Sequence, residues 1–197
     1  MKKKIIFATS NEDKMKEIRM IMADLDYEII SLKEAGITVD IIEDGSSFEE
    51  NALIKARTVM AVTNEIVMAD DSGLEIDAFD KKPGIHSSRF LGEDTPYDIK
   101  NRYILDKLKD VEWDDRTARF VCAIACVFPD GRVITKEGVM EGHIGYEIEG
   151  ENGFGYDPIF WLAEYNTTSA SLTPDQKNKE SHRGKALEAI KEELVNL

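Results

Sequence analysis

Two adjacent carboxylates, Asp70 and Asp71, follow an apolar run of the chain. Adjacent carboxylates raise each other's pKa unless a cation lies between them, and a divalent metal ion is a simple cation for that place. Glu43 lies in a polar loop and is a further candidate ligand, because Mg²⁺ keeps several waters and needs only one or two carboxylates. The pattern therefore indicates a metal site, while an Asp turn with a cap explains the pair equally well.

A polar segment at residues 8–14, ATSNEDK, joins a short apolar run to a segment with helical spacing. Free N–H groups and the dipole at a helix N-terminus favour a phosphate, so this loop is a candidate phosphate site. Capping by Ser10 together with Asp13 is the simpler interpretation. Lys14 favours an anion, because a cation in the first helical turn opposes the dipole and gains nothing for stability. The segment lacks the glycine pattern of a P-loop.

Glycines flank an aromatic residue in the segment GFGYDP, residues 153–158. Glycine lets the backbone approach a flat ligand closely, and Phe154 or Tyr156 offers a ring face for stacking. The alternative is an aromatic plug that closes a lobe, which we favour for Tyr156. The segment therefore predicts a site for a flat ligand.

A cluster of hydrogen-bond donors, SHRGK at residues 181–185, interrupts the C-terminal helical stretch, and Lys177 lies one turn upstream. A solvated basic helix face is the simpler interpretation of such a cluster. His182 and Arg183 beside Gly184 nevertheless indicate a binding site, because the guanidinium of Arg183 donates a planar fork to a carbonyl or a phosphate.

The charge of the chain limits its partners. The 197 residues include 25 Lys and Arg against 39 Asp and Glu, a formal net charge of −14 at pH 7. A polynucleotide binder needs surplus cations to displace counterions from phosphates, so we expect no polynucleotide partner and only a small anionic ligand. Hydrophobic residues make up 42% of the chain, as in ordinary globular proteins.

We expect a cytoplasmic protein without a membrane partner. The apolar run from Ile5 to Ala8 is shorter than the ~7–15 residues of a signal peptide core, and no stretch offers the ~20 apolar residues of a membrane span. Cys122 and Cys126 are four residues apart in a predicted strand. That spacing is roughly 13 Å, beyond disulfide reach, so we predict reduced thiols in the core.

Strands and helices in mixed order must position these residues. Residues 4–8 form a predicted strand, and Ser47 with Glu50 forms a predicted capping box for a helix. Residues 66–69 form a buried strand that is predicted to end at Asp70, where open α/β sheets bind ligands. The other predicted elements are a helix through 15–25, strands at 27–32 and 74–78, a loop at 81–90, a helix through 97–108, a hairpin of 118–128 and 132–140, a helix from Thr173 and a helix through 187–194. This order predicts an α/β fold with a mixed sheet and two lobes about a cleft, as one domain over residues 1–197.

These motifs resemble the inosine triphosphate pyrophosphatase family over nearly the whole chain. The matching segments are, in order, FATSNEDK, EDGSSFEENALIKA, ADDSGLEID, PGIHSSRF, ARFVCAIA, GFGYDPIF and SHRGKAL. Ser10 and Ser88 depart from the glycine and alanine common in the family, and neither change touches the predicted chemistry. The fold that the resemblance implies is a long mixed β-sheet flooring a cleft between two α/β lobes, in proteins that are commonly homodimers.

The resemblance also implies roles for individual residues. Glu43 and Asp71 match the family's Mg²⁺ positions, and Asp71 is also its proposed general base. Asp70 is a second catalytic candidate, and Asn51 and Lys55 lie on a helix that helps to line the cleft. The predicted substrate-binding residues are Thr9, Ser10, Asn11, Glu12, Asp13, Lys14, Lys55, Ser72, Phe154, Gly155, Tyr156, Asp157, Lys177, Ser181, His182 and Arg183.

The implied reaction is Mg²⁺-dependent hydrolysis of inosine, deoxyinosine and xanthosine triphosphates (ITP, dITP and XTP) to the monophosphate and pyrophosphate, which cleanses the nucleotide pool. In that mechanism Asp71 deprotonates the attacking water, Phe154 stacks on the base and residues 181–183 read its 6-oxo edge. The lysines that compensate the phosphate charge are Lys14, Lys55 and Lys177. Two alternatives remain: another metal phosphohydrolase, acting on nucleotides or sugar phosphates, and a non-catalytic nucleotide-binding module.

Overall fold

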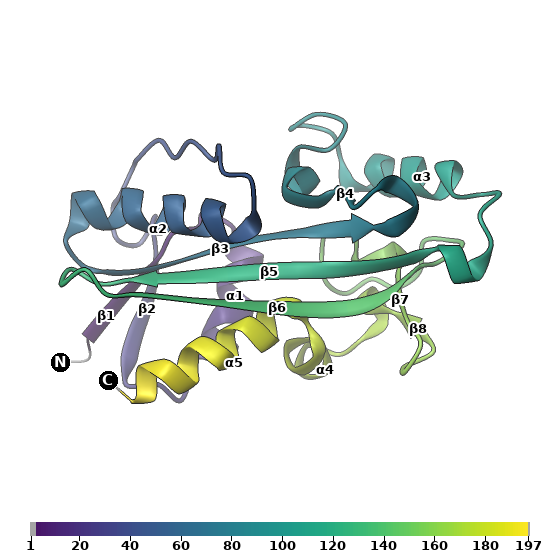
Figure 1. Cartoon of the computed structure of the whole chain (residues 1–197). Helices are drawn as coiled ribbons and strands as arrows, with labels where there is room; N and C mark the ends of the chain where they lie inside the picture. The colour runs from purple at the N-terminus through teal and green to yellow at the C-terminus, as the bar shows by residue number, and fades with distance from the viewer. Residues whose placement is uncertain (1–2, 197) are drawn as a thin grey trace. The chain divides into compact units, whose positions relative to one another are not determined.

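The chain folds into two compact units in the computed structural model, which describes residues 3–196. Unit 1 consists of three segments: the residues up to Asp71, residues 122–138, and the residues from His182 onward. Unit 2 consists of residues 72–121 and 139–181. The strands that contribute residues to both units are β3 (Ile66–Ile76), β5 (Thr117–Val127) and β6 (Val133–Ile144) (Figure 1). Within residues 3–196, no helix combines the length and apolar character that a membrane crossing needs.

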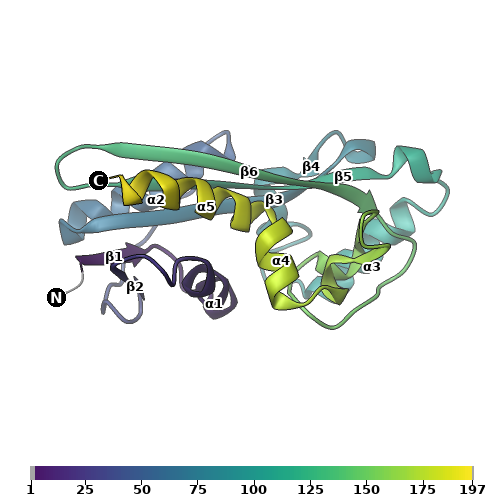
Figure 2. The same cartoon turned by 90° about the horizontal axis from the view of Figure 1, so that it is seen from below.

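Unit 1 carries parallel strands between helices. β1 (Lys3–Phe7) pairs in parallel with β2 (Tyr27–Ser31) and with β3, and the strand order in this unit is β2-β1-β3-β5-β6. Its helices are α1 (Glu12–Ile21), α2 (Phe48–Thr63) and α5 (His182–Val195). α2 lies on one face of these strands, and α1 and α5 lie on the other (Figures 1 and 2). Helices on both faces of parallel strands are typical of an α/β fold.

The core of unit 1 follows the predicted apolar spacing. Met15 and Ile18 of α1 and Ile190 of α5 pack in one buried cluster with Met68 of β3. Side chains two residues apart in a strand share a face. Asp70 therefore lies on the face of β3 that α1 and α5 cover.

The two cysteines behave as predicted. Cys122 and Cys126 are free and buried in β5. Burial raises the pKa of each thiol to about 12, so both stay protonated at neutral pH.

Unit 2 carries antiparallel strand pairs. β3 pairs with β4 (Lys82–Pro83), β6 pairs with β7 (Phe160–Leu162), and β7 pairs with β8 (Thr167–Thr168). The helices of this unit are α3 (Tyr97–Lys107) and α4 (Pro174–Glu180). Short 3₁₀ turns lie at Asp77–Phe79, Gly84–Arg89, Trp113–Asp115, Asp157–Ile159 and Ser169–Ser171. With the parallel pairs of unit 1, these pairs confirm the predicted mixed α/β class, while the single domain and its cleft stay predictions.

The predicted hairpin and the predicted start of α4 are both present. β5 and β6 are neighbouring strands, and the N–H of Gly131 donates to the carbonyl of Phe128 in the turn between them at 3.0 Å. Thr173 and Gln176 form a complete capping box at α4. Both elements follow from local turn and cap chemistry, which a sequence displays directly.

The predicted end of the buried strand at Asp70 is wrong. β3 continues without interruption to Ile76, and Asp70 and Asp71 lie inside it, 2% and 8% exposed. Strands disfavour aspartate, but these two carboxylates meet polar or charged partners from helices. The partners offset the penalty of burying two charges, so the strand does not end there.

Two smaller differences concern a cap and a loop. Ser47 accepts a hydrogen bond from the N–H of Glu50 at 3.1 Å, but the Glu50 carboxylate accepts from Ser46 rather than from Ser47. The capping box of α2 is therefore only half formed. Residues 81–90, predicted to be a loop, contain β4 and a 3₁₀ turn.

Candidate active site

Asp70 and Asp71 point to opposite faces of β3. Successive side chains of a strand alternate in direction, and the partners of these two carboxylates come from different helices. Asp70 contacts cations of α1 and α5, whereas Asp71 contacts side chains of α2. The sequence suggested one cation between the two carboxylates. The structure corrects this, because each carboxylate has partners of its own.

Asp71 belongs to a polar network on the α2 side of unit 1. Lys55 Nζ donates to Asp71 Oδ1 at 3.1 Å and to Glu43 Oε2 at 2.8 Å, and Asn51 Nδ2 donates to Asp71 Oδ2 at 3.1 Å. Burial raises the pKa of Asp71, although Lys55 and Asn51 act in the opposite direction. Burial also lowers the pKa of Lys55, but the neighbouring carboxylates, Asp71 first, outweigh it and raise that pKa. The network thus combines a carboxylate of raised basicity with a fixed ammonium.

Gly45 fixes the orientation of the Asn51 amide. Its N–H donates to Asn51 Oδ1 at 2.9 Å, which leaves the Nδ2 group to face Asp71. A Cβ at Gly45 would lie 2.7 Å from Asn51 Oδ1, closer than carbon and oxygen can pack, so a glycine is required here. Sequence reasoning noted neither this contact nor its consequence for Asp71.

Glu43 and Asp71 fit a divalent cation by the chemistry of their donors. Their oxygens converge on the same Nζ of Lys55, so both carboxylates face one positively charged point. The Glu43 side chain is 34% exposed, so this point is open to solvent on one side. The described residues contain no group of three His, Cys, Asp or Glu side chains that could enclose a metal. A metal held here would rely on two carboxylates and on oxygens from water or substrate, as Mg²⁺ commonly does.

Asp70 is held by Lys14 and Arg183 on the other face of β3. Lys14 Nζ donates to both oxygens of the carboxylate, at 3.1 and 2.9 Å, and Arg183 Nε donates to Oδ2 at 3.3 Å. Arg183 also donates to Glu17 of α1. Burial alone would raise the pKa of Asp70, but the charges of Lys14 and Arg183 outweigh it and hold that pKa well below its usual range. Asp70 is therefore a fixed anion at neutral pH.

The ion pair with Asp70 corrects the inference that Lys14 gains nothing for stability. Lys14 does lie in the first turn of α1, as predicted, but it compensates a buried carboxylate there. Arg183 is 2% exposed, and its guanidinium is bonded to two carboxylates of unit 1. The interpretation of Arg183 as a reader of a base stays a prediction.

The predicted phosphate loop is a turn leading into α1. Asn11 caps the helix in place of Ser10, because Asn11 Oδ1 accepts from the N–H groups of Asp13 at 2.9 Å and Lys14 at 3.1 Å. Two of the N–H groups that were expected to face a phosphate are thus already bonded. The remaining predicted residues of this turn are Thr9, which is half-buried, and Ser10 and Glu12, which are exposed.

In unit 2, Asp157 organises the segment around Phe154. Its Oδ2 accepts from Lys177 Nζ and from the N–H of Phe154, both at 2.8 Å, and its Oδ1 accepts from Ser169 Oγ at 3.0 Å. Lys177 Nζ also lies 4.7 Å from the centre of the Phe154 ring. Gly153 has a φ of +77°, and a Cβ there would lie 2.3 Å from Asp157 Oδ2. The turn therefore requires glycine, and it holds Phe154 against a buried ion pair.

Tyr156 is a core residue, as we favoured from the sequence. Its OH donates to the carbonyl of Ser87 at 2.7 Å, and its ring packs edge-on against Tyr97 with centres 5.1 Å apart. Asn101 Nδ2 donates to the carbonyl of Gly155 at 3.1 Å. Sequence reasoning missed Ser87 and Asn101, because each acts through a backbone carbonyl that no motif displays.

The remaining predicted binding residues lie near the ends of elements or within β3. Ser72 is half-buried in β3, and Ser181 is buried at the end of α4, where its N–H donates to the carbonyl of Lys177 at 2.8 Å. His182 is the buried first residue of α5. A Cβ at Gly138 of β6 would lie 2.1 Å from the carbonyl oxygen of His182, so glycine lets α5 begin against β6. Gly138 is a further residue that sequence reasoning missed.

Known proteins are similar to this chain in sequence and in fold. The sequence pattern of the Ham1 family matches residues 5–193. The chain belongs to the Ham1 family. A protein named dITP/XTP pyrophosphatase, from Exiguobacterium sibiricum, is 45% identical over 192 residues, which cover 98% of this chain and 97% of the relative. Another of that name, from Clostridium perfringens, is 45% identical over 201 residues, with 99% and 98% covered.

The fold of this Ham1 chain also agrees with a solved structure. A HAM1 protein from Coxiella burnetii superimposes with a TM-score of 0.90 at 38% identity, covering 99% of this chain and 100% of the other. The family resemblance drawn from the motifs and the mixed α/β class are thereby confirmed.

Proposed function

We propose that this Ham1 chain hydrolyses ITP, dITP and XTP to the monophosphate and pyrophosphate, and so removes unwanted purine nucleotides from the nucleotide pool. The observation that carries the proposal is the Glu43, Lys55 and Asp71 cluster, a carboxylate of raised pKa beside an ammonium and a second carboxylate. Relatives that are 45% identical and named dITP/XTP pyrophosphatase support the substrate class.

Asp71 is the proposed general base. Its raised pKa makes it a better proton acceptor than an ordinary aspartate, and its bonds to Asn51 and Lys55 fix its direction. In the proposed reaction Asp71 accepts a proton from the water that attacks the α-phosphorus, and pyrophosphate leaves. For Asp70 we propose a positioning role, because its lowered pKa makes it a poor base.

We propose Mg²⁺ as the cofactor, with Glu43 and Asp71 as its protein ligands. When bound, it withdraws negative charge from phosphate oxygens. Lys55 contributes a fixed positive charge at the same point. Lys14 contributes a second positive charge. Its side chain is 20% exposed and so accessible to a phosphate.

Phe154 is the proposed stacking partner of the purine base. Lys177 lies against its ring and is itself held by Asp157, so the ring is ordered before a base arrives. For the 6-oxo edge of the base we propose donors in the segment 181–183. A donor aimed at a 6-oxo group meets another donor when the base carries a 6-amino group, so we expect poor use of adenosine triphosphate (ATP).

The deciding experiment identifies the phosphorus products. The protein is incubated with ITP and Mg²⁺, and the products are followed by phosphorus NMR. We expect inosine monophosphate and pyrophosphate in one step, because the proposed base acts at the α-phosphorus. Stepwise orthophosphate release through a diphosphate would instead indicate another phosphohydrolase, and binding without turnover would indicate a non-catalytic module.

We further propose that the chain works as a cytoplasmic homodimer without polynucleotide or membrane partners. A formal net charge of −14 supports the absence of a polynucleotide partner, because an acidic chain repels polyanions. Sedimentation equilibrium should give about twice the chain mass of 22.2 kDa. The mass of one chain would contradict the dimer and leave the proposed chemistry untouched.

A further inference from the structure

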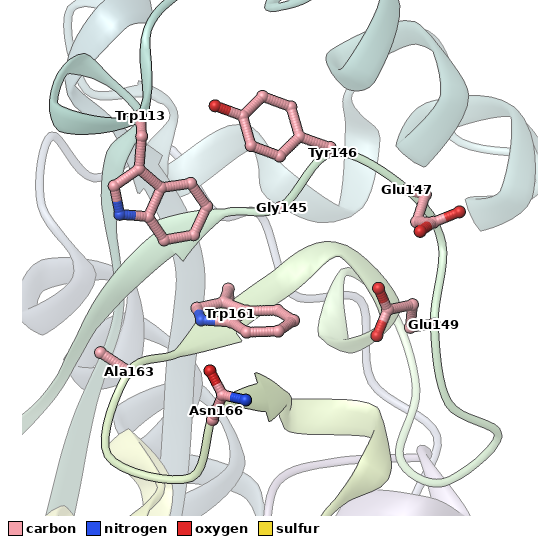
Figure 3. Close-up of a pocket in the computed structure, with 8 residues that line it drawn as sticks. All are labelled: Trp113, Gly145, Tyr146, Glu147, Glu149, Trp161, Ala163 and Asn166. Atoms are coloured by element: carbon pink, nitrogen blue, oxygen red, sulfur yellow. The ribbon is translucent and has the colours of Figure 1, made fainter.

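Unit 2 contains an aromatic cavity that the proposed hydrolysis does not use. The cavity has a volume of about 520 Å³ (Figure 3). The lining side chains that matter here are Trp113, Tyr146, Trp161, Glu147, Glu149 and Asn166. None of them is among the residues proposed above for the metal, the phosphates or the base.

The aromatic wall of the cavity is preformed. The β6–β7 register places His143 opposite Trp161, so their side chains lie on one face of the sheet. Trp113 stacks on His143, with ring centres 4.7 Å apart and planes 5° from parallel. Trp161 meets Trp113 at 86° with centres 6.2 Å apart, and the Tyr146 ring lies 5.7 Å from Trp113. The rings hold one another in place, and Figure 3 shows Trp113, Tyr146 and Trp161 around the cavity.

The cavity also has an acidic side. Glu147 and Glu149 lie across the cavity from Trp113 (Figure 3). Within residues 3–196, neither carboxylate takes part in an ion pair. The guanidinium of Arg116 lies 4.5 Å from the centre of the Tyr146 ring, but it is buried and donates to backbone carbonyls. Two carboxylates against one guanidinium leave an excess of negative charge.

We propose that this cavity binds a small organic cation whose ammonium group lies on the indole faces, with Glu147 and Glu149 as counter-charges. Aromatic faces attract cations through the negative potential of the ring, and tryptophan does so most strongly. The carboxylates disfavour phosphates, so a second nucleotide is not the expected ligand. A cavity of about 520 Å³ accommodates an alkylated amine together with a short polar tail.

The tryptophans provide a direct readout of this site. The chain contains 2 tryptophans, and both line the cavity, so intrinsic tryptophan fluorescence reports on it alone. The full chain is titrated with choline and, separately, with the uncharged alcohol in which carbon replaces the nitrogen of choline. We expect a saturable change with choline and at least about ten-fold weaker binding of the alcohol, because only choline carries the charge.

A pair of matched variants tests the carboxylates. The double variant Glu147→Gln and Glu149→Gln should weaken choline binding by about five-fold or more and leave alcohol binding unchanged. The charge-matched control is the double variant Glu137→Gln and Glu192→Gln, at exposed positions of β6 and α5 in unit 1, which should change neither. Choline binding should also weaken as salt rises, since exposed charges are screened.

Several outcomes would overturn the proposal. One is a wild-type protein that shows no saturable response to choline, and another is equal binding of choline and the alcohol. Both of these outcomes are measured on the wild-type protein, so they do not require that a variant folds. A third is a double variant that binds choline as well as the wild type does. If instead the double variant lost the dimer mass in sedimentation, the cavity would be covered by a second copy of the chain and not by a small cation.

Discussion

At the scale of residues, the two neighbouring aspartates of β3 differ because each faces a different helix. Asp71 lies against α2, where burial raises its pKa, and Asp70 lies against α1 and α5, where two cations lower its pKa. The sequence displayed the pair, but their separation follows only from the continuation of β3 to Ile76. A motif predicts that carboxylates are present, whereas strand geometry assigns them to opposite faces.

Replacing Asp71 by asparagine should lower kcat for ITP by about 10²-fold or more, because the change removes the proton acceptor and keeps its size. In the wild type, activity should fall as the pH is lowered into the range in which Asp71 is protonated, since only its carboxylate form accepts a proton and binds Mg²⁺. Steady-state kinetics at saturating Mg²⁺ measures both effects. Asp94→Asn, at an exposed position, is the control and should keep the wild-type rate. If Asp71→Asn retained more than about a tenth of the wild-type rate, the base would have to be another group.

Asp70 should make the free energy of unfolding fall as the pH is lowered into the acid range. Its pKa is lowered in the folded state from an ordinary value of 3.8, so its contribution is present above that pH and is lost as pH falls toward the folded pKa. Asp70→Asn should destabilise the protein by roughly 3–5 kcal/mol at neutral pH, because it breaks buried ion pairs. Urea unfolding at about pH 7 and about pH 3 should give a smaller pH effect in the variant than in the wild type. The same pH effect in both proteins would exclude Asp70 as its source.

At the scale of elements, local chemistry was predictable and contacts between distant segments were not. The hairpin and the capping box of α4 follow from turn and cap residues that are neighbours in the chain. Gly138 and Asn101 act on backbone carbonyls of residues 44 and 54 positions away in sequence. No period or spacing predicts such contacts, because they depend on the packed tertiary structure.

The cap of α1 offers a paired test of residues one position apart. Asn11→Ala should destabilise the protein by about 1 kcal/mol, because it removes the acceptor for two N–H groups. Ser10→Ala should have a much smaller effect, since Ser10 is exposed and does not cap the helix. Thermal unfolding of both variants measures the difference. If Ser10→Ala lost more stability than Asn11→Ala, Ser10 would be the cap of α1, as the sequence predicted.

At the scale of the whole molecule, an acidic chain must stabilise a polyanionic substrate with few local cations. Binding to the native state alone raises the unfolding free energy, by about 2.7 kcal/mol at a hundred-fold excess over Kd. For a chain of this size we expect an ITP analogue whose α–β phosphate bridge resists hydrolysis, added with Mg²⁺, to raise Tm by about 5–10 °C. The matching ATP analogue at the same concentration should give little change, because of its 6-amino group. Equal shifts from the two nucleotides would contradict selection at the 6-position.

The division of the chain among the two units has a consequence for synthesis on the ribosome. Unit 1 takes residues from three separate segments, and its buried cluster includes Leu187 and Ile190 of α5. α5 also supplies Arg183, a partner of Asp70. Translation proceeds from the N-terminus, so the early part of unit 1 leaves the ribosome long before its last helix exists. Unit 1 must therefore complete its core after translation has passed through unit 2, and the nascent chain exposes apolar strands until then.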